Sequence, residues 1–277
     1  MNRVDLRKLI KGTLVTMPTP FDQDFKVDMG RMAYMTKWWM ANGLGTNDSP
    51  LKVAAAMGEG PDLSDDEWPH LLRTVVNAAG NNAVVICALK AKNTLHTIDD
   101  AKRAQDLGAV GLQIDLPFLH HSNQDDLVRH FTDISDAIDI GIMIYNTHWF
   151  CQNPVAEYMH ADTMLRLDDA EHVVAIKWAV PDGEDYDQMC RFSDTFNVID
   201  NSGQAVRCHK NGGQGYISSL IAVYPPHDLR VWELLETQSY DDAQAELDRV
   251  KDAFAAWNAK VGKRSGGYRS GKALLAA

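Results

Sequence analysis

The sequence predicts a (β/α)8 TIM barrel with extra C-terminal helices. Short apolar runs alternate along the chain with longer amphipathic ones, about eight times. The apolar runs lack a regular polar alternation, which is typical of parallel strands covered on both faces of a sheet. The chain has 277 residues, a length at which an α/β barrel commonly forms one domain.

The expected strands are nearly all apolar, and each is separated from the next by a helical segment. They cover residues 12–21 with the exit loop, 51–57, 83–89, 110–118, 140–146, 173–179, 196–201 and 215–224. This interval favours parallel pairing and closure into a barrel. The alternative is a doubly wound open sheet. That fold would be expected to carry a glycine-rich phosphate-binding turn after the first strand, and none is present.

The expected helices carry recognisable end signals. They cover residues 27–43, 63–80, 97–108, 122–137, 153–167, 182–194 and 202–211, with a helical pattern from 226 onward. Gly43 and Gly80 close the first two. Ser64 and Glu67 have the spacing of a capping box at the start of the second, and Pro154 suits a first helical turn.

We expect two parts in this chain. Residues 1–225 form the barrel, and residues 226–277 form a C-terminal helical extension packed on it, interrupted at Gly266 and Gly267. The net charge is −11, from 38 acidic and 27 basic residues, and the basic ones cluster only weakly in a tail that we interpret as solvated. This charge argues against nucleic acid or an anionic membrane as a partner.

Cysteine usage and the chain's first residues indicate the compartment. The four cysteines form no CxxC pair and fit no zinc spacing: Cys87, Cys151, Cys190 and Cys208. No three histidines or carboxylates have a convincing metal-site spacing, so we expect no metal. The first residues lack the apolar stretch of a signal peptide, and no window approaches the length of a transmembrane helix. A reduced, cytoplasmic protein is the simplest interpretation.

Lys177 is the most unusual of the polar residues that end the expected strands. It lies in the apolar run VVAIKWAV at residues 173–180, and the active site of such a barrel lies at the carboxyl ends of its strands. Burial disfavours the ammonium ion and lowers the pKa of a lysine. A neutral amine can form a Schiff base with a ketone. The alternative is that Lys177 snorkels its charge to water.

Tyr145 ends the preceding strand, so we expect it near Lys177 across the barrel mouth. A phenol there can shuttle a proton to or from a substrate oxygen. The alternative is a core tyrosine with a satisfied hydroxyl. We also place His148 and Trp149, which follow this strand, among the substrate-binding residues. Together these residues suggest carbonyl chemistry through an imine.

Six short motifs occur in order along most of the chain, from about residue 12 to 226. They are TPFD at 19–22, MGEGPDLSDDEW at 57–68, GAVGLQIDLPF at 108–118, IYN at 144–146, VVAIK at 173–177 and GGQGYIS at 212–218. With this order and spacing the sequence resembles the dihydrodipicolinate synthase / N-acetylneuraminate lyase family of class I aldolase-type barrels.

The resemblance implies that Lys177 forms the Schiff base and that Tyr145 is the acid–base residue. The family's loop before its Gly-Glu pair holds the carboxylate of a 2-oxo acid, usually pyruvate, partly through backbone N–H groups. In this sequence the loop consists of Ala55, Ala56, Met57 and Gly58. The backbone of Ile217 would face the site. The resemblance also implies a homotetramer or homodimer and no organic cofactor, because the iminium serves as the electron sink.

Three departures from the family pattern concern substrate binding. Ala56 and Met57 stand where the family usually has two hydroxyl residues. Pro117, Phe118 and Leu119 stand where synthases of the lysine pathway carry Pro-Tyr-Tyr. The segment at residues 147–154 lacks the arginine that grips the second substrate's carboxylate. We therefore expect that the protein is not a true dihydrodipicolinate synthase.

The residues expected at the pocket mouth are strongly apolar: Met57, Phe118, Trp149, Phe150 and Trp178. Such walls suit a bulky or aromatic partner. The expected reaction is aldol addition or cleavage, or hydration or dehydration, on pyruvate or another 2-oxo acid, with the carboxylate held by Lys52, Lys90 or the backbone. The alternative is a catalytically degenerate barrel that binds a 2-oxo acid as a sensor or scaffold.

Overall fold

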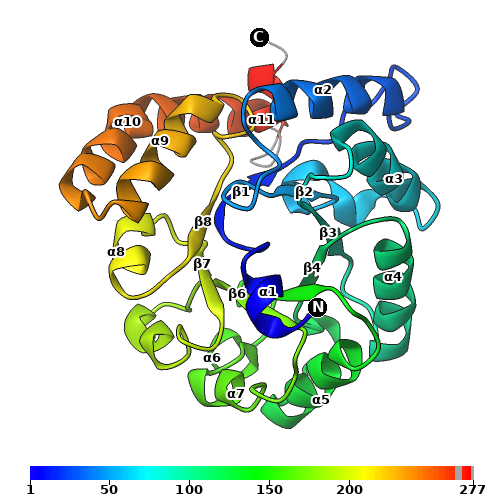
Figure 1. The fold of residues 1–277 in the computed structure, drawn as a ribbon, viewed down its shortest axis with the longest axis vertical. Helices are drawn as coiled ribbons and strands as arrows, with labels where there is room; N and C mark the ends of the chain where they lie inside the picture. Colours follow the sequence, from blue (N-terminus) through cyan, green and yellow to red (C-terminus); the bar gives the residue numbers. More distant parts are fainter. Residues whose placement is uncertain (266–269, 276–277) are drawn as a thin grey trace.

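A computed structural model of the chain describes residues 1–265 and 270–275. Within them, parallel strands close into a barrel in the order β1 to β8, with β8 pairing back to β1, as the sequence predicts (Figure 1). The strands are β1 (Gly12–Thr16), β2 (Leu51–Val53), β3 (Val85–Leu89), β4 (Gly111–Asp115), β5 (Gly141–Tyr145), β6 (Val173–Trp178), β7 (Asn197–Asp200) and β8 (Gly215–Ser218).

Helices surround the barrel and cover its outer face (Figure 1). The helices of the described residues are α1 (Arg3–Arg7), α2 (Met29–Ala41), α3 (Glu67–Ala79), α4 (Thr94–Asp106), α5 (Gln124–Ser135), α6 (Pro154–Glu157), α7 (Ala161–Leu165), α8 (Ala205–Lys210), α9 (Pro225–Glu236), α10 (Tyr240–Ser265) and α11 (Ser270–Leu275). Short 3-10 turns are η1 (Ala56–Gly58), η2 (Gly60–Asp62), η3 (Phe118–His120) and η4 (Tyr186–Arg191). Each strand is largely buried because the helices cover one face and the barrel interior the other.

The capping box expected before α3 is present. The Ser64 amide donates to the Glu67 carboxylate at 2.9 Å, and the Glu67 amide donates to the Ser64 hydroxyl at 3.1 Å. These two bonds satisfy amides that the helix itself cannot pair. They also fix the entry of the chain into α3 directly after the loop that follows β2.

The helix expected over residues 153–167 is interrupted between α6 and α7. The Asn146 side chain donates to the Met159 carbonyl at 3.0 Å and accepts from the Met159 amide at 2.9 Å. Tyr158 is extended, and its hydroxyl donates to Glu184 at 2.9 Å. These tertiary bonds take the backbone groups that a continuous helix would use, so the single-helix prediction is wrong.

The helix expected over residues 182–194 is instead the 3-10 turn η4. The indole of Trp178 donates to the Tyr186 carbonyl at 2.9 Å, and the Asp185 side chain accepts from the Asp187 amide at 3.0 Å. The Tyr186 carbonyl accepts from Trp178 of β6 and is not free for a regular α-helix. The segment therefore forms a tighter and shorter 3-10 turn.

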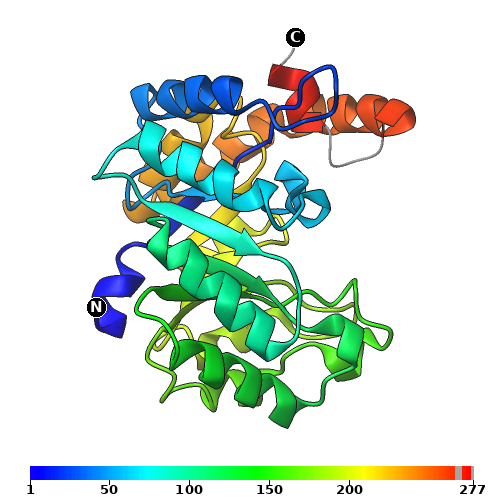
Figure 2. The ribbon, with the colours of Figure 1, turned by 90° about the vertical axis from the view of Figure 1, so that its right-hand side faces the viewer.

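The first helix closes the amino-terminal end of the barrel, opposite the end toward which the strands point (Figure 2). Leu6 and Ile10 belong to the apolar cluster that fills the barrel interior. A Cβ at Gly111 or Gly141 would lie 2.7 or 2.9 Å from Ile10 Cδ1. The two glycines therefore leave the space that this plug occupies. The open end of the barrel is the carboxyl end.

The C-terminal helices follow β8, and α11 lies beside α2 (Figure 1). The Lys272 ammonium forms an ion pair with Glu59 and lies 4.3 Å from the Phe21 ring centroid. The extension thereby contacts loops at the carboxyl end of the barrel. Its division from the barrel at residue 225 stays a prediction, and Gly266 and Gly267 lie outside the described residues.

Candidate active site

Three polar side chains form one layer at the carboxyl end of adjacent strands. Asp115 in β4 pairs in register with Tyr145 in β5, and Tyr145 pairs with Lys177 in β6. Met143 and Ala175, two residues before Tyr145 and Lys177, belong to the cluster inside the barrel. Side chains two apart in a strand share a face, so all three polar side chains face the barrel interior.

Lys177 is almost fully buried, with 6% of its surface exposed. Its Nζ lies 3.3 Å from the centroid of the Tyr145 ring. Burial holds the pKa of Lys177 well below its usual range, the nearby Lys52 lowers it further, and Asp115 opposes them. The structure therefore differs from the alternative in which this lysine extends its charge to water.

The Tyr145 side chain spans from β5 toward the end of β7. Its hydroxyl accepts a hydrogen bond from the side-chain Nδ2 of Asn201 at 3.4 Å, while its ring lies under the Lys177 amine. The indole of Trp149 packs edge-on against the same ring at 5.6 Å between centroids. The phenol is thus held beside the amine, with its hydroxyl on the β7 side of it.

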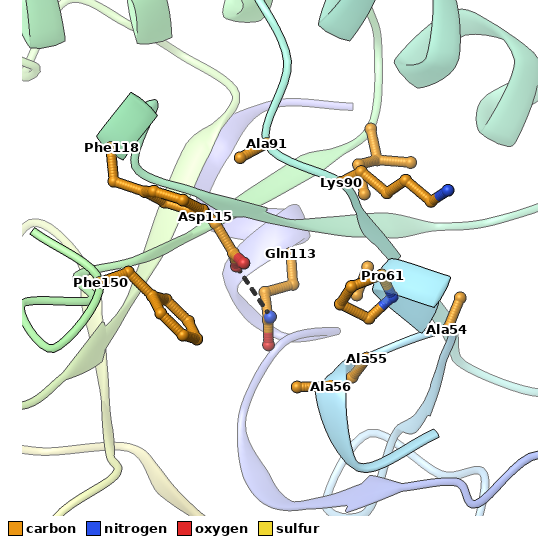
Figure 3. A pocket seen from close by; sticks show the side chains of 12 residues that line it. Ala54, Ala55, Ala56, Pro61, Lys90, Ala91, Gln113, Asp115, Phe118 and Phe150 are labelled. Atoms are coloured by element: carbon orange, nitrogen blue, oxygen red, sulfur yellow. Dashed lines mark hydrogen bonds between the residues drawn. The ribbon is translucent and has the colours of Figure 1, made fainter. Parts of the chain in front are cut away.

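A second lysine, Lys52 in β2, is fully buried inside the barrel. Its Nζ donates to Gln113 Oε1 at 3.0 Å, and Gln113 Nε2 donates to Asp115 Oδ1 at 3.2 Å (Figure 3). Burial lowers the pKa of Lys52 to about 7. Burial also raises the pKa of Asp115 to about 6, against the opposing effect of Lys177.

Sequence reasoning considered Lys52 only as a carboxylate ligand and did not select Gln113. A usable signal was present, because Gln113 and Asp115 lie two residues apart in one strand and so share a face. The contact with Lys52 comes from a strand more than fifty residues earlier. No pattern along the chain indicates that pairing.

A cavity of about 320 Å³ opens beside this polar layer. It is lined by Ala54, Ala55, Ala56, Pro61, Ala88, Leu89, Lys90, Ala91, Gln113, Asp115, Phe118 and Phe150. Asp115 and Gln113 point into the space between the two phenylalanine rings and the Ala54–Ala56 segment (Figure 3). Lys90 is directed away from Asp115, and its ammonium donates to the Leu63 carbonyl. The cavity is mainly apolar with one carboxyl group in its wall.

The loop after β2 is shaped by close backbone contacts. Ala54 and Glu59 have left-handed backbone angles, with φ of 58° and 56°. A Cβ at Gly60 would lie 1.6 Å from the Ala54 carbonyl oxygen, and one at Gly58 would lie 2.5 Å from the Met17 carbonyl oxygen. Non-glycine residues at positive φ are strained, and such strain is commonly found at functional sites.

The predicted loop residues are divided between the cavity wall and the turn behind it. Ala55 and Ala56 line the cavity. Met57 and Gly58 complete the 3-10 turn η1, and neither is part of that lining. Ile217 packs against the apolar cluster inside the barrel, next to β1. The roles of these residues in substrate binding stay predictions.

His148 and Trp149 lie just after β5, where the sequence places them. Their rings pack edge to face, with 4.7 Å between centroids. Trp149 is 43% exposed, and burial lowers the pKa of His148. They reach the site through the contact of Trp149 with Tyr145 rather than through the cavity lining.

The expectation that Trp178 stands at the pocket mouth is wrong. Its side chain is fully buried on the outer face of β6, where its ring packs against Phe192 at 5.2 Å between centroids. Asp200, at the end of β7, is likewise structural. It accepts hydrogen bonds from the Tyr186 hydroxyl at 2.8 Å and from the Gln204 amide at 2.7 Å.

Neither a metal site nor a membrane span is found in the part of the chain that the structure describes. No group of three or more histidine, cysteine, aspartate or glutamate residues there could hold a metal ion. Within the same residues, no helix has both the length and the apolar character that crossing a bilayer requires.

Residues 9–258 match the dihydrodipicolinate synthetase family. The chain belongs to this family. Its members are lyases of the class I aldolase type, which agrees with a buried lysine and a tyrosine at the carboxyl end of a barrel. The family assignment and the barrel fold confirm the resemblance seen in the six sequence motifs.

Two similar proteins are both named 4-hydroxy-tetrahydrodipicolinate synthase. A 4-hydroxy-tetrahydrodipicolinate synthase of Acidothermus cellulolyticus is 33% identical over 62% of this chain and 53% of its own length. One from Exiguobacterium sp. is 28% identical over 92% of this chain and 90% of its own length. The chain thus spans about half of the first relative and most of the second.

Solved structures show the same fold. The crystal structure of a chloride-inhibited dihydrodipicolinate synthase from Acinetobacter baumannii, complexed with pyruvate, superposes with a TM-score of 0.79 at 21% identity. The match covers 88% of this chain and 82% of that one. At this identity the likeness supports the barrel architecture alone.

Proposed function

We propose that this protein is a Schiff-base-forming lyase that acts on pyruvate or another 2-oxo acid. The observation that carries the proposal is the buried Lys177 amine, 3.3 Å from the Tyr145 ring at the carboxyl end of the barrel. A desolvated amine is nucleophilic at neutral pH and attacks the ketone carbon. The Tyr145 phenol moves protons to and from the substrate. The iminium formed on Lys177 is the electron sink, so the reaction needs no cofactor.

The carboxylate of the 2-oxo acid is proposed to bind the backbone of the loop after β2. Two lysines were alternatives, but Lys52 is bonded to Gln113 and Lys90 to the Leu63 carbonyl. Within residues 54–60, the backbone hydrogen bonds are donated by the amides of residues 58, 59 and 60. The amides of Ala56 and Met57 remain for an anionic ligand.

We propose an apolar or aromatic second substrate or leaving group, in an aldol or a hydration–dehydration reaction. The walls beside Asp115 are alanine, proline and phenylalanine side chains, which suit an apolar group better than a dicarboxylate. The names of the relatives favour 4-hydroxy-tetrahydrodipicolinate synthase activity instead. Comparing kcat/KM for aspartate semialdehyde and for benzaldehyde, each with pyruvate, separates the two. A clear preference for aspartate semialdehyde would reject the apolar-substrate proposal.

Borohydride trapping tests the imine directly. Pyruvate is incubated with the protein and reduced, and the adduct is mapped by mass spectrometry. We expect one reduced adduct on Lys177 and none in Lys177→Ala. The control is Lys92→Ala, because Lys92 is a partly exposed lysine paired with Asp65 and Asp100 near the same end of the barrel. Thermal stabilisation by pyruvate with no adduct would favour the degenerate barrel that binds without turnover.

The proposal includes a homotetramer or homodimer in the cytoplasm, with no nucleic acid or membrane partner. Large apolar side chains are exposed near the barrel mouth, including Leu119, with 70% of its surface exposed, and Phe150, with 45%. Such surfaces are commonly covered in oligomers. Light scattering coupled to size-exclusion chromatography measures the mass, and a stable monomer would remove this part of the proposal.

A further inference from the structure

A proton-transfer group is needed on the cavity side of Lys177. The Tyr145 hydroxyl is held by Asn201 on the β7 side of the amine. The cavity lies mainly on the other side, lined by residues after β2, by residues in or after β3 and β4, and by Phe150 after β5. A 2-oxo acid bound between the cavity and Lys177 therefore presents one side of its ketone carbon away from the phenol.

Asp115 is the carboxyl group on that side. It lines the cavity, and its strand is separated from that of Lys177 only by β5. Two strand spacings place the two Cα atoms about 10 Å apart. The lysine and aspartate side chains, extended toward each other from the same face, together cover that distance. Their charges influence each other, since Lys177 lowers the pKa of Asp115 and Asp115 raises that of Lys177.

The buried pair of Lys52 and Gln113 lies next to Asp115, and the imine chemistry proposed for Lys177 and Tyr145 does not use it. Lys52 donates to Gln113, and Gln113 donates to Asp115, all inside the barrel. Burying a second lysine in the core is costly. The arrangement orients the Gln113 amide so that its N–H group faces Asp115, and it adds a second positive group near Lys177.

We propose that Asp115 is a second proton-transfer residue of this active site, held toward Lys177 and the cavity by the buried Lys52–Gln113 pair. The inference rests on the proposed Schiff-base function and assigns one of its steps. Lys177 attacks the ketone carbon and gives a carbinolamine. Asp115, as the carboxylic acid, protonates its hydroxyl group. The C–O bond breaks, water leaves, the nitrogen lone pair forms the C=N bond, and Asp115 remains as the carboxylate.

The protonation state of Asp115 suits this step. Burial raises its pKa to about 6, near neutral pH, where a carboxyl group can both give and recover a proton. The titratable groups facing it are Lys52 from β2, Tyr145 from β5 and Lys177 from β6. Lys90, from the end of β3, lines the same cavity but directs its ammonium to the Leu63 carbonyl.

The test is the rate of borohydride trapping with pyruvate in Asp115→Asn. Loss of the acid is expected to slow imine formation about 100-fold or more. A purely electrostatic role predicts the opposite sign. Removing the negative charge would lower the pKa of Lys177 further and leave more neutral amine. A rate equal to or above that of the wild type would therefore overturn the proposal.

Two controls separate this result from failure of folding or of the proposed function. Asp65→Asn removes an exposed carboxylate that pairs with Lys92 outside the cavity, and its rate should stay at the wild-type value. If the wild type itself forms no adduct, the Schiff-base function fails and this inference fails with it. If the wild type reacts and Asp115→Asn reacts equally fast, only this inference fails.

The positioning role of Gln113 has a separate readout. In Gln113→Leu, the maximal trapping rate should fall about 10-fold while the pyruvate concentration for half-maximal rate stays unchanged, since the carboxylate site is intact. Asp115→Ala is a second variant for the case in which Asp115→Asn does not fold. Added formate should restore part of its trapping rate, because formic acid can replace the missing carboxyl group. An unchanged maximal rate in Gln113→Leu, or no rescue in a folded Asp115→Ala, would contradict the proposal.

Discussion

At the scale of single residues, charge burial decides what this site can do. The barrel encloses two lysines and one aspartate within a few strands, and a group loses its charge more easily when it loses water. Lys177 and Lys52 thereby have lowered pKa values, and Asp115 has a raised one. Lys52 and Asp115 thereby exchange protons near neutral pH, which the proposed imine chemistry requires.

The buried Lys52 should make stability depend on pH in a predictable direction. Its pKa is about 7 in the folded protein and about 10.4 in the unfolded chain, so between these values only the unfolded state is protonated. Its contribution is therefore unfavourable at and below pH 7 and is relieved as pH rises toward 10. We expect the unfolding free energy of the wild type, relative to Lys52→Met, to rise by about 1.4 kcal/mol per pH unit in this window.

Urea unfolding at pH 7, 8 and 9 measures this difference. The comparison cancels the exposed lysines, which titrate alike in both proteins. Lys177 titrates in both, but its pKa is lower in the wild type because Lys52 lies nearby. Parallel stability curves would mean that Lys52 keeps an ordinary pKa, and the account of its burial would be wrong.

The phenol of Tyr145 is predicted to act after the imine has formed. Tyr145→Phe keeps the ring under Lys177 and removes only the hydroxyl, which contacts Asn201. We expect borohydride trapping with pyruvate to persist in this variant. Exchange of the pyruvate methyl protons into D2O, followed by NMR, should slow about 100-fold or more. Undiminished exchange would assign that proton transfer to another group.

At the scale of elements, the loop after β2 combines two strained residues with glycines in tight contact. Ala54 and Glu59 have positive φ, and Gly60 lies against the Ala54 carbonyl. These contacts fix the turn η1, whose first amides we assign to the substrate carboxylate. The capping box of Ser64 and Glu67 then connects the loop to a stable helix.

Gly60→Ala should disrupt this loop. The added methyl group would overlap the Ala54 carbonyl at 1.6 Å, so the backbone must move. We expect the free energy of unfolding to fall by about 2–4 kcal/mol. We also expect the pyruvate concentration for half-maximal trapping to rise at least 10-fold. The matched control is Gly30→Ala in α2, where the nearest atom lies 3.5 Å away and alanine favours the helix.

Unfolding curves and pyruvate titrations check both variants. Gly30→Ala should be as stable as the wild type or more so and should bind pyruvate normally. A Gly60→Ala protein with wild-type stability and trapping would show that the loop can shift without loss.

At the scale of the whole molecule, the C-terminal helix is tied to the same loop. Lys272 in α11 pairs with Glu59, and both side chains are largely shielded, with 23% and 20% of their surfaces exposed. An ion pair that is partly removed from water can contribute more than a fully exposed one. The tail and the loop after β2 are therefore expected to move together.

Hydrogen exchange provides the check. In Glu59→Gln, the amides of residues 270–275 should exchange faster, because the helix loses its charged contact with the barrel. Arg230→Gln is the control, since the ion pair described for Arg230 is with Glu233, within its own helix turn. Equal protection of residues 270–275 in Glu59→Gln and the wild type would show that the ion pair does not hold the helix.

The barrel and the positions of Lys177 and Tyr145 at its carboxyl end could be predicted from the sequence because their signals are local. Apolar runs, glycine ends and the VVAIK and IYN motifs are each contained in a few consecutive residues, and the order of the strands follows the order of the chain. The same local patterns were misleading at residues 153–167 and 182–194. There, side chains of Asn146 and Trp178 take backbone groups that the helices would have used.

The Lys52–Gln113–Asp115 chain was decided only by closure of the barrel. Its members come from β2 and β4, which are brought together by their shared neighbour β3 and by the twist of the sheet. The sequence pattern of a lysine in an apolar strand is the same whether its amine reaches water or a buried amide. The direction of the side chain settles that question, and it follows from the register of strands far apart in the chain.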